Sequence, residues 1–378
     1  MDLRLNDAVM NVELSGIRRF TYLVRDTPGA CALTIGEPDQ NTPGPIKEAA
    51  KAALDNNNTH YPPGNGFPYL LQAISRFEAE HHGLPYSPDE IMVTVGATEA
   101  VFVTLSTLLN PGDEVIIPTP AFGLYEAIVR LCRGVPVFLP TEDSGFQIDS
   151  GALAAALTPR TKAVILTSPN NPTGCIYSKE TLDAIHDLLK DRPVFVVCDD
   201  VYRTLTYVDG YHSFAEYQDM RDRIVVVQSF SKPYAMTGWR VGYVMADAAV
   251  KSRLEVFHQY AVTSVPAFIQ PACVKALETD TKPMLEIFRK RRDYVYHRLT
   301  DMGLSIQEPQ GAFYVFVDVR KYGMDSITFC ERMLKESLVG VIPGIYFGTE
   351  GYMRLSYCYS DEDLKEGLDR IEQFIKSL

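Results

Sequence analysis

Short apolar runs and amphipathic stretches alternate along the middle of the chain, from about residue 91 to residue 246. The apolar runs are rich in Val and Ile, which is typical of strands buried on both faces, and the stretches between them repeat apolar residues at helical spacing. This alternation predicts a mostly parallel sheet covered by helices on both faces, and hence an α/β fold. The expected strands are 91–95, 114–117, 135–139, 163–167, 194–199, 224–230 and 241–246. The helices expected between them include 97–109, 121–132 and 179–190.

The two ends of the chain have a different pattern. Leu14, Ile17 and Phe20 stand at helical spacing near the start, and beyond residue 260 the helical stretches lengthen while strands become fewer. A chain of 378 residues is too long for a typical single core. We therefore expect a large domain, 36–265, and a smaller α+β domain built from both ends, 1–35 and 266–378. The elements expected outside the central pattern are helices 46–56, 266–277 and 283–302, strands 311–317, 339–342 and 353–357, and a last helix capped by Ser360.

The composition of the chain excludes several classes of binding partner. The net charge of -12 argues against nucleic acid, because phosphate binding requires clustered Lys and Arg. The seven cysteines are scattered and form no CxxC pair, so we expect a reducing compartment and no metal site. The first seven residues include Asp2 and Asp7 where a signal peptide needs a basic region and an apolar core, and no apolar run reaches membrane-spanning length. These features predict a soluble cytoplasmic protein without a membrane partner.

The segment from Ser229 to Gly242 carries the clearest chemical signal. It follows the buried strand 224–230, so Lys232 stands at the carboxyl end of a strand, where open α/β sheets bind their ligands. An amine flanked by Ser229 and Ser231 and followed by Arg240 suits a covalent imine with an aldehyde cofactor that also carries a phosphate. The simpler interpretation is an exposed loop lysine.

This segment resembles the cofactor-lysine motif of the pyridoxal-phosphate enzymes of fold type I, in particular the class I and II aminotransferases. Matching segments follow in the expected order from Ile35 to Tyr357, which covers most of the chain. The resemblance implies a large domain with a seven-stranded, mostly parallel sheet. It also implies that Lys232 holds pyridoxal 5'-phosphate and is the catalytic residue.

Two further motifs follow buried strands. Asp199 ends the apolar strand 194–199, and a carboxylate in such surroundings requires a cationic partner unless it serves as a helix cap or turn residue. The resemblance implies that Asp199 pairs with the cofactor's ring nitrogen and that Tyr202 reaches its phenolic oxygen. Asn171 lies in a rigid turn with two prolines and a glycine. The resemblance gives it a contact to the same phenolic oxygen, close to the substrate.

The start of the expected helix 97–109 is a candidate phosphate site. A helix N-terminus offers unpaired N–H groups, although Thr98 at this position is also consistent with a simple N-cap. The resemblance implies that Ala97, Thr98, Ser229 and Arg240 bind the cofactor's phosphate. It also implies that Phe122 stacks on the pyridine ring, where the alternative is a core phenylalanine.

Arg354 and Tyr61 extend the candidate site. Arg354 lies in an apolar strand, where an unpaired guanidinium is costly, so it requires a carboxylate. The resemblance supplies the substrate's α-carboxylate, with the backbone of Gly36 as a second contact; a surface salt bridge is the competing account. Tyr61 lies in a Pro- and Gly-rich loop. The resemblance implies that it reaches the phosphate of a neighbouring subunit's cofactor, and it therefore implies a homodimer with shared active sites. The same loop is equally consistent with a plain surface turn.

The resemblance predicts an aminotransferase that passes an amino group between an L-amino acid and a 2-oxo acid in two half-reactions. The segment 345–347 favours an aromatic or other neutral amino acid slightly over aspartate, whereas Arg18 or Arg19 would suit a second carboxylate. The same residues fit a carbon–sulfur β-lyase or an aminocyclopropane-carboxylate synthase. A non-enzymatic regulatory relative is less favoured, because no DNA-binding module is evident. A nicotinamide-dependent dehydrogenase is disfavoured because no GxGxxG follows a strand.

Overall fold

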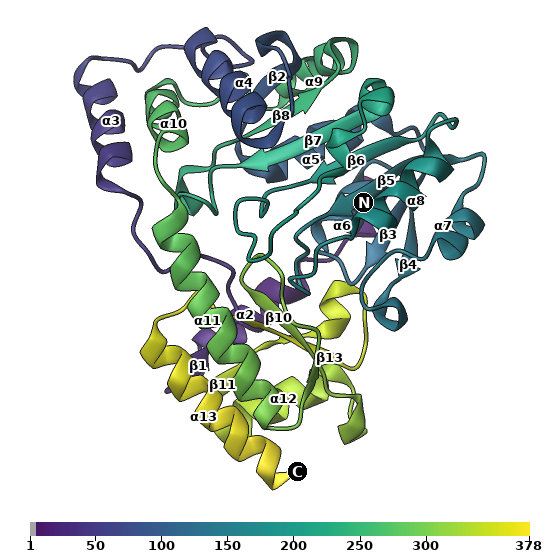
Figure 1. Ribbon diagram of the computed structural model, residues 1–378, viewed down its shortest axis with the longest axis vertical. Coiled ribbons are helices and arrows are strands. Elements are labelled where there is room, and N and C mark those ends of the chain that lie inside the picture. The colour runs from purple at the N-terminus through teal and green to yellow at the C-terminus, as the bar shows by residue number, and fades with distance from the viewer. Residues whose placement is uncertain (1–4) are drawn as a thin grey trace, which may run out of the picture.

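A seven-stranded sheet forms the centre of the computed structural model, which describes residues 5–378 (Figure 1). The first four residues of the segment 1–35, which we expected in the small domain, lie outside the described residues. The strand order is β2-β8-β7-β6-β5-β3-β4, and all neighbours are parallel except β8, which is antiparallel to both β2 and β7. The mostly parallel sheet expected from the sequence is thus confirmed. Its strands are β2 (Ile91–Thr94), β3 (Glu114–Thr119), β4 (Val135–Pro140), β5 (Thr161–Thr167), β6 (Phe195–Asp199), β7 (Ile224–Ser229) and β8 (Gly242–Ala246).

Helices cover both faces of this sheet because successive strand residues point to opposite sides. Alternate side chains of β7 illustrate the division: Val225 and Val227 pack on one face, and Ile224 and Val226 on the other. The first face is covered by α5 (Gly96–Leu108), α6 (Leu124–Leu131) and α9 (Ala248–Ala261). The second face is covered by α3 (Gly44–Asp55), α4 (Pro68–His82), α7 (Ser150–Ala156), α8 (Lys179–Leu189) and α10 (Gln270–Leu277).

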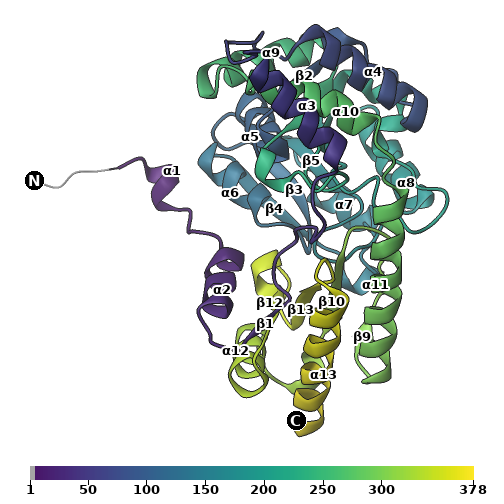
Figure 2. The same cartoon turned by 90° about the vertical axis from the view of Figure 1, so that its left-hand side faces the viewer.

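A second, four-stranded antiparallel sheet lies below the first in Figure 1, in the order β12-β13-β10-β9. A short parallel pair, β1 with β11, joins the two ends of the chain. Figure 2 shows the N-terminal helices along one side of the molecule. The remaining elements are β1 (Cys31–Ala32), β9 (Ser305–Ile306), β10 (Tyr314–Asp318), β11 (Val339–Gly340), β12 (Ile342–Pro343), β13 (Tyr352–Ser356), α1 (Asp7–Met10), α2 (Gly16–Arg25), α11 (Lys282–Asp301), α12 (Ser326–Ser337) and α13 (Asp361–Ser377).

Several expected boundaries shift. Leu14 lies outside α2 and is almost fully exposed, because Ser15 caps the helix by accepting the Arg18 N–H. The expected strand 339–342 is two short strands that pair with different partners. Helix α10 packs on α3 and α4, so this segment lies with the large sheet although it follows residue 265. The expected cap of the last helix is confirmed, since Ser360 accepts the Asp363 N–H. Within residues 5–378 no helix combines the length and the apolar character that crossing a bilayer requires.

Candidate active site

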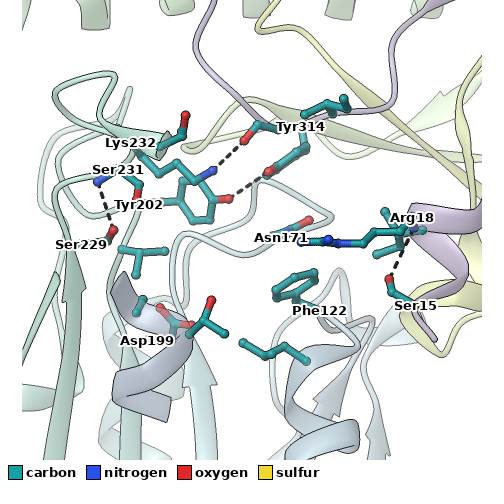
Figure 3. A pocket seen from close by; sticks show the side chains of 18 of the residues that line it. Ser15, Arg18, Phe122, Asn171, Asp199, Tyr202, Ser229, Ser231, Lys232 and Tyr314 are labelled. Carbon is teal, nitrogen blue, oxygen red and sulfur yellow. Dashed lines mark hydrogen bonds between the residues drawn. The ribbon is translucent and has the colours of Figure 1, made fainter. Parts of the chain in front are cut away.

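A cavity of about 460 Å³ opens at the carboxyl ends of β5, β6 and β7 (Figure 3). Parallel neighbours end at the same edge of a sheet, so residues that follow these strands converge there. The cavity gathers every predicted site residue except Tyr61. These residues are Gly36, Ala97, Thr98, Phe122, Asn171, Asp199, Tyr202, Ser229, Lys232, Arg240 and Arg354.

Lys232 follows β7 and points into the cavity. Its Nζ donates a hydrogen bond of 2.6 Å to the carbonyl oxygen of Gly36. Burial lowers the pKa of Lys232 to about 8, and the nearby guanidinium groups of Arg240 and Arg354 act in the same direction. A lower pKa leaves a larger fraction of the amine unprotonated near neutral pH, and the unprotonated form is the nucleophile.

Asp199, the last residue of β6, has one carboxylate oxygen bound and one free. Oδ2 accepts a hydrogen bond of 2.6 Å from the hydroxyl of Tyr125, which in turn accepts one of 2.9 Å from the Thr167 hydroxyl. Oδ1 is buried and has no hydrogen-bond partner among the described residues. Burial raises the pKa of Asp199 to about 6, against the opposing effect of Tyr125 and the Val201 N–H. This oxygen is therefore open to a hydrogen-bond donor or cation bound in the cavity.

The first turn of α5 and the loop after β7 form the opposite end of the cavity. Gly96 has φ +75°, and a Cβ atom built on it would lie 2.9 Å from Nη2 of Arg240, so only glycine allows this close approach. Thr98 is exposed and is not the N-cap, which is Val95. The helix N-terminus and the guanidinium together make an anion-binding corner.

Arg354, on β13, is 3% exposed and has only neutral hydrogen-bond acceptors. Its Nη1 donates to Oδ1 of Asn171 at 2.9 Å, and its Nη2 donates to the carbonyl oxygen of Thr34. Its guanidinium also lies 4.5 Å from the centre of the Tyr314 ring. No carboxylate of the described residues lies within 4 Å of it, so the surface salt bridge that was the competing account is absent from the described part of the chain. A buried cation of this kind attracts a carboxylate ligand.

Tyr202, Tyr314 and Gly36 form the wall beside Lys232. The hydroxyls of Tyr202 and Tyr314 lie 2.9 Å apart, and Figure 3 shows both rings next to the lysine. A Cβ atom on Gly36 would lie 1.7 Å from the Tyr314 hydroxyl, so a larger residue is excluded there. Phe122 lies in the loop between β3 and α6 rather than on a helix, and its ring borders the cavity.

Tyr61 is the predicted residue that the structure does not bring into the cavity. Its side chain is 90% exposed, in a loop that borders a separate surface hollow with Val262 and Pro266. Its predicted contact was to a neighbouring subunit, which a single chain does not test.

Sequence reasoning missed three residues of the site. Tyr125 and Thr167 were assigned only to a helix and a strand, yet they hold Asp199. Tyr314 was assigned to a strand, and its contact with Tyr202 spans 112 positions. The spacing of Tyr125 three residues after Phe122 is the one available signal, since the expected helix 121–132 places both in its first turns.

The start of helix α2 and its cap border the cavity, and they include Arg18, one of the two arginines considered for a second carboxylate. Ser15, Ile17 and Arg18 line the cavity. The turn 345–347 lines an adjoining hollow of about 630 Å³ together with residues 11–19, so the two segments named for substrate contact are neighbours.

This geometry defines a class of enzyme. A seven-stranded sheet with a single antiparallel strand, a second sheet formed late in the chain, and a lysine at the carboxyl end of β7 are the features of fold type I, and solved structures of that fold match along nearly the whole chain. The sequence model described as "Aminotransferase class I and II" matches residues 30–371. The chain therefore belongs to the class I and II aminotransferases, which are pyridoxal-phosphate-dependent transferases.

The relatives of this chain differ in the substrates that their names give. A probable N-acetyl-LL-diaminopimelate aminotransferase of Bacillus subtilis is 41% identical, over 99% of this chain and 96% of its own length. Aromatic-amino-acid aminotransferase 2 of Thermococcus litoralis is 38% identical, over 99% of both chains. The solved aspartate aminotransferase of Thermus thermophilus with maleate has a TM-score of 0.93 and 35% identity, covering 98% of this chain and 100% of its own.

Proposed function

We propose that this enzyme moves an amino group between an L-amino acid and a 2-oxo acid in two half-reactions, with pyridoxal 5'-phosphate held at Lys232. The observation that carries this proposal is the pairing, in one cavity, of a buried lysine with a depressed pKa and a buried arginine that lacks a carboxylate partner. The amine of Lys232 is able to form an imine with a carbonyl group, and the guanidinium of Arg354 is able to bind the carboxylate of an amino acid.

The residues of the cavity fit this cofactor. The free Oδ1 of Asp199 would hold the ring nitrogen, and the corner formed by Ala97, Thr98 and Arg240 would hold the phosphate. Ser229 would add a hydroxyl to the phosphate site. Phe122 would stack on the ring, while Asn171 and Tyr202 would contact its phenolic oxygen. When bound, the cofactor supplies an electron-withdrawing ring that stabilises negative charge at the substrate's α-carbon.

The protein's own groups orient the substrate and move the proton. Arg354 binds the α-carboxylate, and Asn171 fixes the guanidinium so that it faces the cavity. Lys232 Nζ removes the proton from the substrate's α-carbon and would deliver it to the carbon that was the cofactor's carbonyl carbon, so that the amino group stays with the cofactor when the 2-oxo acid leaves. Tyr314 packs against the backbone of Gly36, and its hydroxyl leaves no room for a side chain there.

The overall organisation belongs to the same proposal. The large sheet with residues 36–265 is the cofactor-binding domain, and residues 1–35 with 266–378 form the smaller domain, with α10 as a helix of the latter segment that packs on the former. The exposure of Tyr61 and of Val262, which borders the same hollow, supports a homodimer in which Tyr61 reaches the partner's phosphate site.

An aromatic or other neutral amino acid is the donor that we favour. Four apolar side chains line part of the cavity, those of Ile17, Ile35, Leu124 and Phe122. An apolar substrate side chain is stabilised in such a site because its surface leaves water.

Aspartate is the second candidate, and Arg18 favours it. Arg18 lines the same cavity, and its guanidinium makes no ion pair with a described residue. A second carboxylate on the substrate would pair with it.

Borohydride reduction of the reconstituted enzyme tests the cofactor assignment. We expect a covalent cofactor adduct on the peptide that contains Lys232, visible by mass spectrometry, and none in Lys232→Ala. Lys162→Ala is the matched control, because Nζ of Lys162 and of Lys232 each lie 5.7 Å from an aromatic ring centre. An adduct that survives in Lys232→Ala contradicts the assignment.

A panel of donors and acceptors tests the reaction. Aromatic amino acids and aspartate are each mixed with several 2-oxo acids, and cystathionine is offered in parallel. Amino transfer without pyruvate release from cystathionine supports the proposal. Release of pyruvate from cystathionine without amino transfer would favour the β-lyase chemistry instead.

A further inference from the structure

A buried histidine joins the start of α5 to the loop that carries Tyr61 and Gly64. His258, in the last turn of α9, is fully buried. Its Nδ1 lies 2.6 Å from Oε1 of Glu99, in the first turn of α5, and its Nε2 lies 2.9 Å from the carbonyl oxygen of Gly64. Both ring nitrogens therefore face atoms that only accept hydrogen bonds.

A neutral imidazole has a single N–H and would leave one of these acceptors without a donor. An imidazolium has two N–H groups and satisfies both. Burial lowers the pKa of His258, and this is outweighed by the Glu99 carboxylate, the Gly64 carbonyl and the charge of Glu255, so that the pKa is raised above its usual value. Among the described residues, Glu99 is the charged group from α5, Glu255 the one from α9 itself, and the loop contributes only its carbonyl.

The contacts continue outward from the ring at both ends. The second carboxylate oxygen of Glu99 accepts the N–H of Val95, the residue that precedes the turn Gly96-Ala97-Thr98. On the other side, Gly64 lies three residues after Tyr61, and the adjacent Asn65 accepts the Val93 N–H at 2.9 Å through its carbonyl. One side chain thus connects the start of α5 with the loop that carries Tyr61.

We propose that His258 is a positioning residue, held as an imidazolium, that fixes the start of α5 and the Tyr61 loop relative to each other. The charged ring acts through Glu99 on the turn that binds phosphate, and through Gly64 on the loop. The inference rests on the proposed function, which identifies the bound anion as the phosphate of pyridoxal phosphate. The two hydrogen bonds of the His258 ring are independent of that identification.

Nitrogen-15 NMR of the holoenzyme with labelled histidines tests the state of the ring. We expect one of the histidine side chains to show two protonated nitrogens at pH 7, and this signal to disappear in His258→Gln. The signal should lose one proton only at a pH above the usual range of histidine. A His258 ring with a single protonated nitrogen at pH 6.5 would overturn the proposal.

Binding of pyridoxal phosphate as a function of pH tests the positioning role. His258→Gln and Glu99→Gln should each weaken binding about tenfold at pH 6.5, because each removes a charge-assisted hydrogen bond. The raised pKa means that the protonated ring contributes at low pH and that this contribution is lost as the pH rises through it, so the difference from wild type should shrink by pH 9.

His186→Gln is the matched control, since His186 also pairs with a carboxylate, Asp219 at 2.7 Å, but lies on α8 away from the cavity. It should bind pyridoxal phosphate as wild type does. Unchanged binding in His258→Gln at pH 6.5, or an equal loss at every pH, overturns the positioning role. If the wild-type enzyme binds no pyridoxal phosphate, the proposed function fails, while the NMR measurement still decides the state of the ring.

Discussion

Two buried arginines in this molecule have opposite surroundings. Arg203 is 5% exposed, and its Nη2 donates to both carboxylate oxygens of Glu78, at 2.7 and 2.8 Å. Arg354 is 3% exposed, and it donates only to the neutral oxygens of Asn171 and Thr34. The first arginine has its counter-charge inside the protein, and the second does not.

The difference separates a structural charge from a functional one. Burying a charge without a partner costs several kcal/mol, and an internal ion pair offsets part of that cost. The cost of burying the Arg203 charge is partly offset by Glu78. The charge of Arg354 is buried at the wall of a cavity without a counter-charge from the protein, and a carboxylate ligand is able to supply one. An uncompensated buried cation therefore marks the end of the cavity where we expect the substrate to bind.

Removal of Arg354 should give the largest effect on catalysis. Arg354→Met is expected to lower kcat/KM about thousandfold, since the loss of one partner of a buried, hydrogen-bonded charge pair costs about 2–5 kcal/mol. Its free energy of unfolding, measured in urea, should stay the same or rise because a cost is removed. A loss of stability as large as that of Arg203→Met would break the comparison.

Glu78→Gln tests the other arginine and should mainly change stability. The free energy of unfolding should fall by about 3–5 kcal/mol, because Arg203 is then left without its carboxylate. The activity per folded molecule should stay within about threefold of wild type. The double variant Glu78→Gln with Arg203→Met should recover most of the stability. A thousandfold loss of activity in folded Glu78→Gln would contradict the division into two roles.

Tyr125→Phe should have a smaller effect that depends on pH. Burial raises the pKa of Asp199, and the Tyr125 hydroxyl opposes this, so its removal moves the pKa further up from about 6. Asp199 is then protonated over a wider acid range, and the acid limb of the kcat/KM profile should move to higher pH. We expect about a tenfold loss at pH 6 that recovers by pH 8. Tyr177→Phe, at another buried tyrosine, should leave the profile in place.

Arg18→Leu should give the smallest change. Arg18 is exposed, so solvent screens its charge and an ion pair there is worth about 1 kcal/mol or less. The ratio of kcat/KM for aspartate to that for phenylalanine should fall about fivefold. Arg19→Leu is the control, because Arg19 contacts the Tyr346 hydroxyl at 3.4 Å outside the main cavity. Equal ratios in the two variants would remove Arg18 from the choice of substrate.

The sequence predicted the parts of the site that have a local signal. Lys232, Asp199 and Asn171 each follow a buried apolar strand, and the end of such a strand is visible in the order of residues. Arg354 was predictable because a charge within an apolar strand requires an explanation. The family resemblance then assigned a role to each, which neither spacing nor composition provided.

Contacts between distant segments were not predictable in the same way. Tyr125 meets Asp199 across 74 positions, and the hydroxyl of Tyr314 meets that of Tyr202 from the other sheet. Nothing in the alternation along a strand indicates which opposing side chain it will meet. Arg203, one residue after Tyr202, was not singled out, because its carboxylate lies on α4, a helix that the sequence pattern did not predict.

The pairing of β7 with β8 on both sides of the loop that carries Lys232 limits how the sequence of this loop can change in length. Ser229 and Gly242 are opposite each other in the pairing of β7 with β8, so the residues between them form a closed loop with both ends anchored. An inserted or deleted residue there would displace Lys232 and Arg240 together, since both lie in this short loop. Homologues are therefore expected to keep the length of this loop constant even where its other residues have been exchanged.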